Sequence, residues 1–318
     1  MIRYGCNKLI FEIKMEIINL DENVIKTLDF FAENKVPKLN LKKFDLPFVI
    51  GSGNAYNTGA ILFSDKAAVL ADESNFKRLI KAYAKAIKQN LINQVIIISA
   101  SGEKDSVWEV ELAKKYKLKT TLLTCEAESS AAKKADEVVV YRKIAEPYTY
   151  NVSTYLGMIL SATKEDPQMI KHLIKKIRLP KNFAQYKSFS FVLPDRFAGI
   201  CPMIDIKKSE LFGPHLSLRA FPEGHARDAK FVIPSNEELV ISIGCENKYF
   251  GQSKHRWSID LQDEIGFGLM LCLTYYLIGK IQAIKPAYFK ENIENYCHDY
   301  GPKAYGKSEY FDVVVPGN

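Results

Sequence analysis

Two stretches of the chain hold residue types that could bind an anion and move a proton. In residues 94–115, QVIIISASGEKDSVWEVELAKK, an apolar run leads into a Ser/Gly loop and then into a helical pattern. Such a turn aims backbone N–H groups and hydroxyls at a small anion. Further along, Glu210 is followed fifteen positions later by His225, a carboxylate and an imidazole that suit proton transfer. Together they indicate chemistry on a sugar phosphate.

The Ser/Gly loop is the candidate phosphate site. Ser99, Ser101, Gly102 and Ser106 supply hydroxyls and open backbone in one turn. The loop follows a predicted strand, and open α/β sheets bind ligands at the carboxyl ends of their strands. The alternative is that Ser101 or Asp105 only caps the next helix, and the residues alone leave both interpretations open.

Two other short segments are candidate ligand contacts. The loop at residues 51–54, GSGN, raises the possibility of a dinucleotide site, but GSGNAY lacks the third glycine of the GxGxxG fingerprint. We therefore expect its backbone to approach a small sugar instead. Near the start of a later helical pattern, Ser153 and Thr154 fit a helix cap and a ligand contact equally well.

Glu210 and His225 match the needs of an aldose–ketose interconversion. That reaction needs a base to move a proton between adjacent carbons, and a second group to open the sugar ring. A partly buried carboxylate with a raised pKa suits the first task, and a histidine suits the second. The alternative is that Glu210 pairs with Lys207 or Lys208 and that His225 is a hydrogen-bonded loop residue. No HxxxH or HExxH motif occurs, so neither a metal nor a cofactor is predicted.

Strand and helix patterns alternate around these residues, which predicts βαβ units and parallel sheets. The 318 residues allow two domains. Expected strands of the first are LPFVIGSG, AAVLADE, QVIIIS, KTTLLT and EVVVY, with SSAAKKA as a short helix. Expected strands of the second are KSFSFVLP and ELVISIG, with a helix near residues 203–212. We predict an N-terminal helical segment (1–44), a first domain (45–165), a linker helix with a second domain (166–285) and a C-terminal tail (286–318).

Bulk properties favour a soluble cytoplasmic protein. The net charge of +7 is spread along the chain rather than gathered in arginine-rich runs, so no nucleic-acid partner is expected. Six cysteines without a CxxC pair indicate neither zinc nor a disulfide framework. The most apolar stretch, residues 265–281, borders the length that spans a bilayer, but glycines and Lys280 interrupt it. A buried core helix, and no membrane partner, is the better interpretation.

The motifs resemble those of the sugar isomerase (SIS) domain family, over residues 46–284 as two consecutive units. ISASGEKDS looks like the family loop that binds the sugar phosphate, which implies that Ser99 and Ser101 hold phosphate. Gly53 and Asn54 look like the family's first loop. Ser153, in NVSTY, resembles a serine that contacts the sugar.

The second half carries the resemblance to the catalytic stretch. ELFGPHLSLRAFPEGH looks like the family segment with the proton-transfer glutamate and the ring-opening histidine, which places those roles on Glu210 and His225. His215 and Glu223 also resemble family residues between them. The resemblance implies two doubly wound, flavodoxin-like αβα subdomains and a homodimer in which the histidine often crosses from the partner.

The chain also departs from the family pattern. Lys104 stands where a phosphate-binding threonine is usual, and Ala55 replaces a common serine. A cation at position 104 could still hold phosphate or select another anion. A lysine near the family's C-terminus often closes the site, and the candidates here are Lys285, Lys290 and Lys303. Two functions follow: a sugar-phosphate isomerase with an enediol-type intermediate, or a phosphosugar-binding regulator without catalysis.

Overall fold

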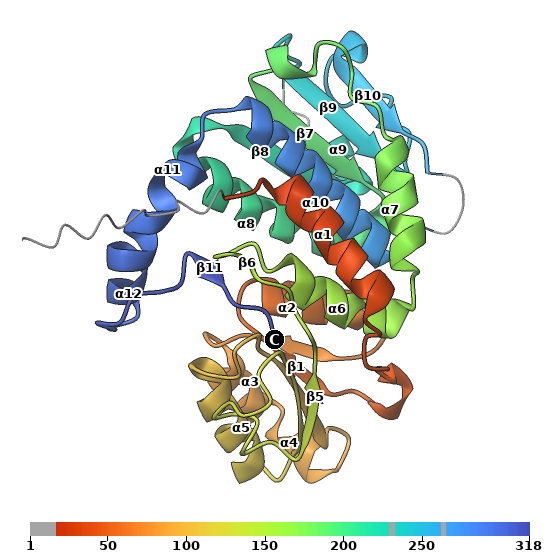
Figure 1. Cartoon of the computed structure of the whole chain (residues 1–318). Helices are drawn as coiled ribbons and strands as arrows, with labels where there is room; N and C mark the ends of the chain where they lie inside the picture. The colour runs from red at the N-terminus through yellow and green to blue at the C-terminus, as the bar shows by residue number, and fades with distance from the viewer. Residues whose placement is uncertain (1–16, 229–232, 262–264) are drawn as a thin grey trace, which may run out of the picture.

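The computed structural model describes residues 17–228, 233–261 and 265–318, which form two parallel sheets with helices around them (Figure 1). The strand order is β2-β1-β3-β4-β5 in the first sheet and β10-β9-β7-β8 in the second. Every strand pair within these two sheets is parallel. The predicted class, α/β with two doubly wound units, is confirmed.

The first sheet contains the five strands that the sequence predicts. Its central strands are buried because helices cover both faces. The strands are β1 (Phe48–Ile50), β2 (Val69–Ala71), β3 (Gln94–Ile98), β4 (Lys119–Thr124) and β5 (Glu137–Val140); the helices are α2 (Asn54–Leu62), α3 (Phe76–Ala82), α4 (Ala84–Lys88) and α5 (Asp105–Lys115).

One predicted helix of this unit is wrong. The SSAAKKA segment forms a series of turns, because the carbonyl of Gly102 accepts the N–H of Ala131 and draws the segment against the 99–106 loop. Gly102 itself has φ +62°, and a side chain there would overlap Ser129.

The second sheet has two strands beyond those predicted. β8 and β10 lie at its edges, where mixed polar and apolar residues weaken the strand pattern. The strands are β7 (Ser188–Leu193), β8 (Ser217–Pro222), β9 (Glu238–Ile243) and β10 (Arg256–Ile259), and the helices are α8 (Cys201–Phe212) and α9 (Glu223–Asp228). The division of the chain at residues 165/166 remains our proposal, supported by the fact that each of these two sheets draws its strands from one half.

A layer of helices lies between the sheets: α1 (Leu20–Glu33), α6 (Val152–Thr163) and α10 (Phe267–Ile284) contact one another, and α7 (Pro167–Lys176) packs on α1 and α10 (Figure 1). Gly279 of α10 lies against the backbone of Asp21, so any side chain there would push α1 away. Lys280 pairs with Asp21 at 2.6 Å. By length and composition α10 could span a membrane, but 72% of it is buried inside the protein, as expected for a core helix.

Glu165 holds the N-terminus of α10. Its Oε2 accepts from the N–H of Gly268 at 2.7 Å, and its Oε1 accepts from the N–H of Leu269 at 2.9 Å. A carboxylate at a helix N-terminus satisfies unpaired donors and complements the helix dipole. We expect Glu165→Ala to lower the free energy of unfolding by about 1–2 kcal/mol in urea titrations. The exposed Glu128→Ala is the control, and an equal loss in both variants would contradict the capping role.

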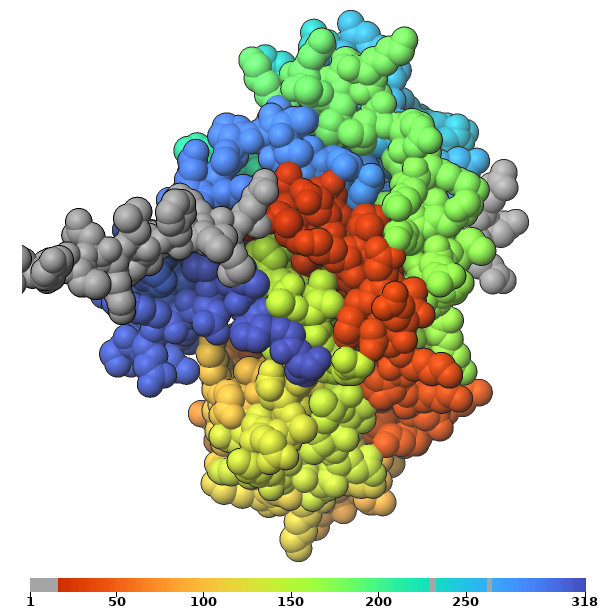
Figure 2. All heavy atoms as spheres, viewed as in Figure 1, coloured from red at the N-terminus to blue at the C-terminus, as the bar shows by residue number. Residues whose placement is uncertain are grey.

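The C-terminal segment returns to the first unit. It contains α11 (Tyr288–Asn295), a π-helical turn (Tyr296–Tyr300), α12 (Gly301–Ala304) and β11 (Val314–Val315), which pairs antiparallel with β6 (Glu146–Pro147). Figure 2 shows this segment in dark blue against the first unit. Asn318 accepts the N–H of Lys143 at 2.8 Å. The end of the chain thus lies beside the carboxyl edge of the first sheet.

Candidate functional site

A cavity of about 520 Å³ lies at the carboxyl edge of the first sheet. It is lined by the loops that follow β1 and β3, by the segment before α6, by Glu210 of α8 and by C-terminal residues that include Tyr305 and Val315. From β1 the chain passes to β2 on one side, and it then crosses to β3 on the other side of β1. The strand order therefore reverses beside β1, and open sheets bind ligands at such a switch point.

The 99–106 loop keeps hydroxyl protons available for an anion. Ser99 Oγ accepts from the N–H of Gly102 at 3.1 Å, and Ser101 Oγ accepts from the N–H of Glu103 at 3.3 Å. Because both oxygens act as acceptors within the loop, their O–H groups are left to donate into the cavity. Ser106 instead donates to the carbonyl of Glu103 at 2.8 Å, so its proton is already used.

Lys104 is held by aromatic rings of the C-terminal segment. Its Nζ lies 3.6 Å from the centre of the Tyr305 ring and 5.7 Å from that of Phe311. Burial lowers the pKa of Lys104, and the nearby charge of Lys307 lowers it further. The lysine lines the cavity and at the same time fastens the C-terminal segment over it by cation–π attraction.

Glu210 lies in the same cavity as the 99–106 loop. Its Oε2 pairs with Nζ of Lys207 at 2.6 Å; the lysine side chain is fully buried, whereas that of Glu210 is 24% exposed. Lys207 also donates to the carbonyl of Thr149. Burial raises the pKa of Glu210, and the charge of Lys207 opposes this rise. The alternative interpretation, in which Glu210 pairs with Lys207 or Lys208, is confirmed for Lys207, and the carboxyl group of Glu210 also lines the cavity.

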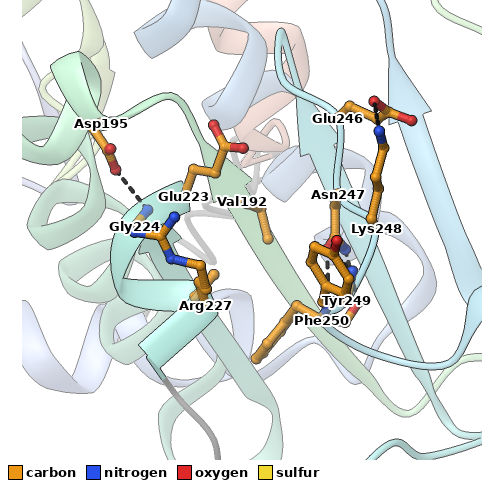
Figure 3. Close-up of a pocket in the computed structure, with 11 residues that line it drawn as sticks. Val192, Asp195, Glu223, Gly224, Arg227, Glu246, Asn247, Lys248, Tyr249 and Phe250 are labelled. Atoms are coloured by element: carbon orange, nitrogen blue, oxygen red, sulfur yellow. Dashed lines mark hydrogen bonds and ion pairs between the residues drawn. The ribbon is translucent and has the colours of Figure 1, made fainter.

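His225 does not reach this cavity within its own chain. It lies exposed on α9 rather than in the predicted loop. The N–H of Gly224 donates to Asp195 at 2.7 Å, which anchors the start of that helix. Figure 3 shows α9 beside a second cavity of about 410 Å³ at the carboxyl edge of the second sheet, lined by Glu223 and Arg227 of α9 and by the 246–250 loop. One chain therefore does not bring His225 to Glu210.

The first loop contributes through different residues from those expected. Ser52 and Ala55 line the cavity, while Gly53 (φ +55°) and the buried Asn54 lie between them without lining it. The loop lies at the cavity as predicted, although Gly53 and Asn54 form its turn and do not line the cavity.

Ser153 is not at the cavity surface. It is fully buried, donates to Glu146 at 2.7 Å and accepts from the N–H of Ile144 at 3.2 Å. The next residue, Thr154, lines the cavity instead. The helical phase of α6 therefore gives Ser153 a structural role and exposes Thr154 to the cavity.

The predicted C-terminal lysines lie elsewhere. Lys285 donates to the carbonyl of Tyr186, Lys303 pairs with Asp299, and Lys290 lines a separate small cavity. Lys143, which the sequence did not single out, lines the main cavity and pairs with Glu126 at 3.0 Å. Several further lining residues were also missed: Glu109, Tyr148, Tyr155 and Tyr296.

Metal binding finds no support in residues 17–228, 233–261 and 265–318, where no group of three or more His, Cys, Asp or Glu side chains could hold an ion. The cavity thus offers hydroxyls, carboxyls, lysines and aromatic rings as its chemistry.

No protein-family model and no curated protein matches the sequence. Solved structures do match. Glucosamine-6-phosphate deaminase from Thermotoga maritima is 18% identical with a TM-score of 0.55, covering 83% of this chain and 93% of that chain. The C-terminal domain of glucosamine-fructose-6-phosphate aminotransferase from Francisella tularensis is 12% identical with a TM-score of 0.55 and the same coverage.

Tagatose-6-phosphate ketose/aldose isomerase from Escherichia coli is 12% identical with a TM-score of 0.51, covering 83% of this chain and 86% of that chain. At such identities the likeness is one of fold. The chain therefore has the fold of the sugar isomerase (SIS) domain proteins, as the motifs suggested.

Proposed function

We propose that the protein is an aldose–ketose isomerase of a phosphorylated sugar. The observation that carries this proposal is that Glu210 and the 99–106 loop line one cavity. Ser99 and Ser101 donate hydrogen bonds to the phosphate, which fixes the sugar. Glu210 then has a carboxyl group within the same enclosed space, and the charge of Lys207 opposes the rise in its pKa that burial causes, which favours the ionised form.

The reaction moves one proton between two carbons. The C2–H bond of the aldose breaks, Glu210 takes the proton, and the electron pair forms a C1=C2 double bond while the carbonyl oxygen is protonated. The resulting enediol loses the proton of its C2 hydroxyl and accepts the proton from Glu210 at C1, which gives the ketose. No oxidant or cofactor is required, since the substrate is oxidised at C2 and reduced at C1.

The names of proteins with this fold agree with the substrate class. One is a ketose/aldose isomerase and two carry glucosamine 6-phosphate or fructose 6-phosphate in their names. The direct test is deuterium incorporation at C2 of hexose 6-phosphates in D₂O. It is measured by NMR as the loss of the C2 proton signal. Absence of exchange with every sugar phosphate that binds would contradict the proposal.

His225 enters the proposal through a homodimer. Because it does not line the cavity of its own chain, we propose that the partner subunit supplies it to open the ring. Mixing Glu210→Gln chains with His225→Ala chains should then restore activity, since a hybrid dimer has one site with both intact residues. Random reassociation makes half the dimers hybrid, so about one quarter of wild-type activity is expected. No recovery on mixing would mean that the two residues do not meet across subunits.

A second candidate function is phosphosugar binding without turnover. It is favoured by Lys104, which replaces a threonine and lies on Tyr305 rather than free in the loop. This protein would be stabilised by sugar phosphates in thermal unfolding, because a ligand that binds only the folded state raises the melting temperature. It would show no exchange at C2. A cytoplasmic location belongs to both proposals, in keeping with five free cysteines in the part of the chain that the structure describes.

A further inference from the structure

The cavity proposed for a sugar phosphate is lined by more acidic than basic side chains. Two lysines line it, Lys104 and Lys143. Six carboxyl side chains do so: Glu73, Glu103, Asp105, Glu109, Glu146 and Glu210. The phosphate of the proposed substrate takes its hydrogen bonds from the 99–106 loop, and the acidic side chains add no attraction for it. The excess of acid calls for a second, cationic part of the ligand.

Four of the six carboxyl groups already have partners. They are Glu210 with Lys207, Glu146 with Asn23 and Ser153, Glu103 with the N–H of Ser130, and Asp105 with Trp108. The side chains of Glu73 and Glu109 make no hydrogen bond or ion pair to any residue that the structure describes. These two side chains are therefore the carboxyl groups of the cavity lining that have no partner among the described residues.

Glu109 is the more unusual of the two. It is only 2% exposed, it lines the cavity from the first turns of α5, and its Oε1 is buried without a hydrogen-bond partner in the described parts of the chain. A buried carboxyl oxygen without a partner costs free energy. Burial raises the pKa of Glu109 to about 8, and the charges of Asp105, Glu73 and Asp72 add to this rise. No cation of the described residues opposes this rise, so the ionised form of Glu109 has no partner that stabilises it.

The two lysines that line the cavity do not fill this place. Lys104 is held over the ring of Tyr305, and Lys143 pairs with Glu126. A metal ion is not indicated either, since no metal-ligating group of three was found among the described residues. An ammonium group on the ligand, which is a cation and a hydrogen-bond donor, would be a suitable partner for the carboxyl group of Glu109.

We propose that Glu109 and Glu73 form a subsite for a cationic amino group, so that the substrate is a phosphorylated sugar that also carries an amine. This inference rests on the proposed function, because it places the phosphate on the 99–106 loop. An ammonium donates up to three hydrogen bonds. It would satisfy Oε1 of Glu109 and favour the ionised form of that side chain, while Glu73, which is exposed, adds charge at the rim.

The test compares glucosamine 6-phosphate with glucose 6-phosphate and N-acetylglucosamine 6-phosphate by isothermal titration calorimetry. We expect the amine to bind at least about tenfold more tightly than the other two, the size of a charge-assisted hydrogen bond. In Glu109→Gln the ratio should fall to about one. Glu103→Gln is the matched control, since Glu103 lines the same cavity but already accepts from Ser130, and it should keep the preference.

A second readout follows from the protonation of Glu109. At pH 7 its carboxyl is largely protonated and must ionise when an ammonium binds, so a proton passes to the buffer. Titrations in two buffers of different ionisation enthalpy should show about one more proton released with glucosamine 6-phosphate than with glucose 6-phosphate. The acidic groups that face Glu109 are Asp105 on its own helix and Asp72 and Glu73 before α3. The extra proton should be absent in Glu109→Gln.

The outcomes separate this inference from the proposal beneath it. Equal binding of all three sugars, or a preference that survives in Glu109→Gln, overturns the ammonium subsite and leaves the isomerase proposal in place. Failure of all three sugars to bind overturns both.

Discussion

The Glu210→Gln variant is expected to lose deuterium exchange at C2 of its sugar phosphate by about 10²–10⁴-fold, the range for removal of a general base. Glutamine keeps the size of the side chain but cannot accept a proton. The measurement is the rate of C2 proton loss in D₂O at saturating substrate. The matched control is Asp205→Asn, because Asp205 lies exposed on α8 and pairs with Lys208 just as Glu210 pairs with Lys207. Exchange in that control should equal the wild type.

The pH profile gives the same prediction a second test. The base must be ionised to accept a proton, so the exchange rate rises with pH through the pKa of Glu210. Burial raises that pKa, whereas the charge of Lys207 lowers it. If Glu210→Gln retained wild-type exchange, the base would lie elsewhere, and Glu109 would be the next carboxyl to test, since it lines the same cavity and has a raised pKa.

Local patterns were enough to single out the 99–106 loop, whereas Glu210, which lines the same cavity, was singled out by the resemblance to the SIS family. A buried strand, a Ser/Gly turn and a helix follow one another in sequence, so the 99–106 loop is encoded within about twenty residues. The same holds for the five strands of the first sheet. The edge strands β8 and β10 were missed because few of their residues are buried, which removes the apolar pattern that marks a strand.

Other features depend on distant parts of the chain. Lys207 is a typical surface residue by type, and it is buried only because α8 packs on α10, where Nζ lies 5.7 Å from the ring centre of Tyr275. Glu109 occupies an apparently polar position of α5, and its burial follows from neighbouring segments. Tyr305 and Lys104 are far apart in sequence and meet through the return of the C-terminal segment. The periodicity of apolar residues along the sequence contains no information on contacts between such distant segments.

Lys207→Met is expected to be the most destabilising single change in the site. The substitution keeps the volume of the buried stem but removes the charge that balances Glu210. Leaving one member of a buried ion pair alone costs about 3–5 kcal/mol. Urea titration at pH 8 should show a loss of this order. The double variant Lys207→Met/Glu210→Gln should recover much of it, because no charge is then left uncompensated.

The sign of the pH dependence identifies the cause of that loss. In Lys207→Met the pKa of Glu210 in the folded state lies still further above its unfolded value, so the unfolded state releases the proton more readily and stability falls as pH rises. Near pH 4.5, the ordinary value for a glutamate, more of the carboxyl is protonated in both states. The deficit of Lys207→Met should therefore be larger at pH 8 than at pH 5, and the double variant should not show this difference. An equal deficit at both pH values would mean that Lys207 stabilises α8 by packing alone, and Glu210 would then have no electrostatic support as a base.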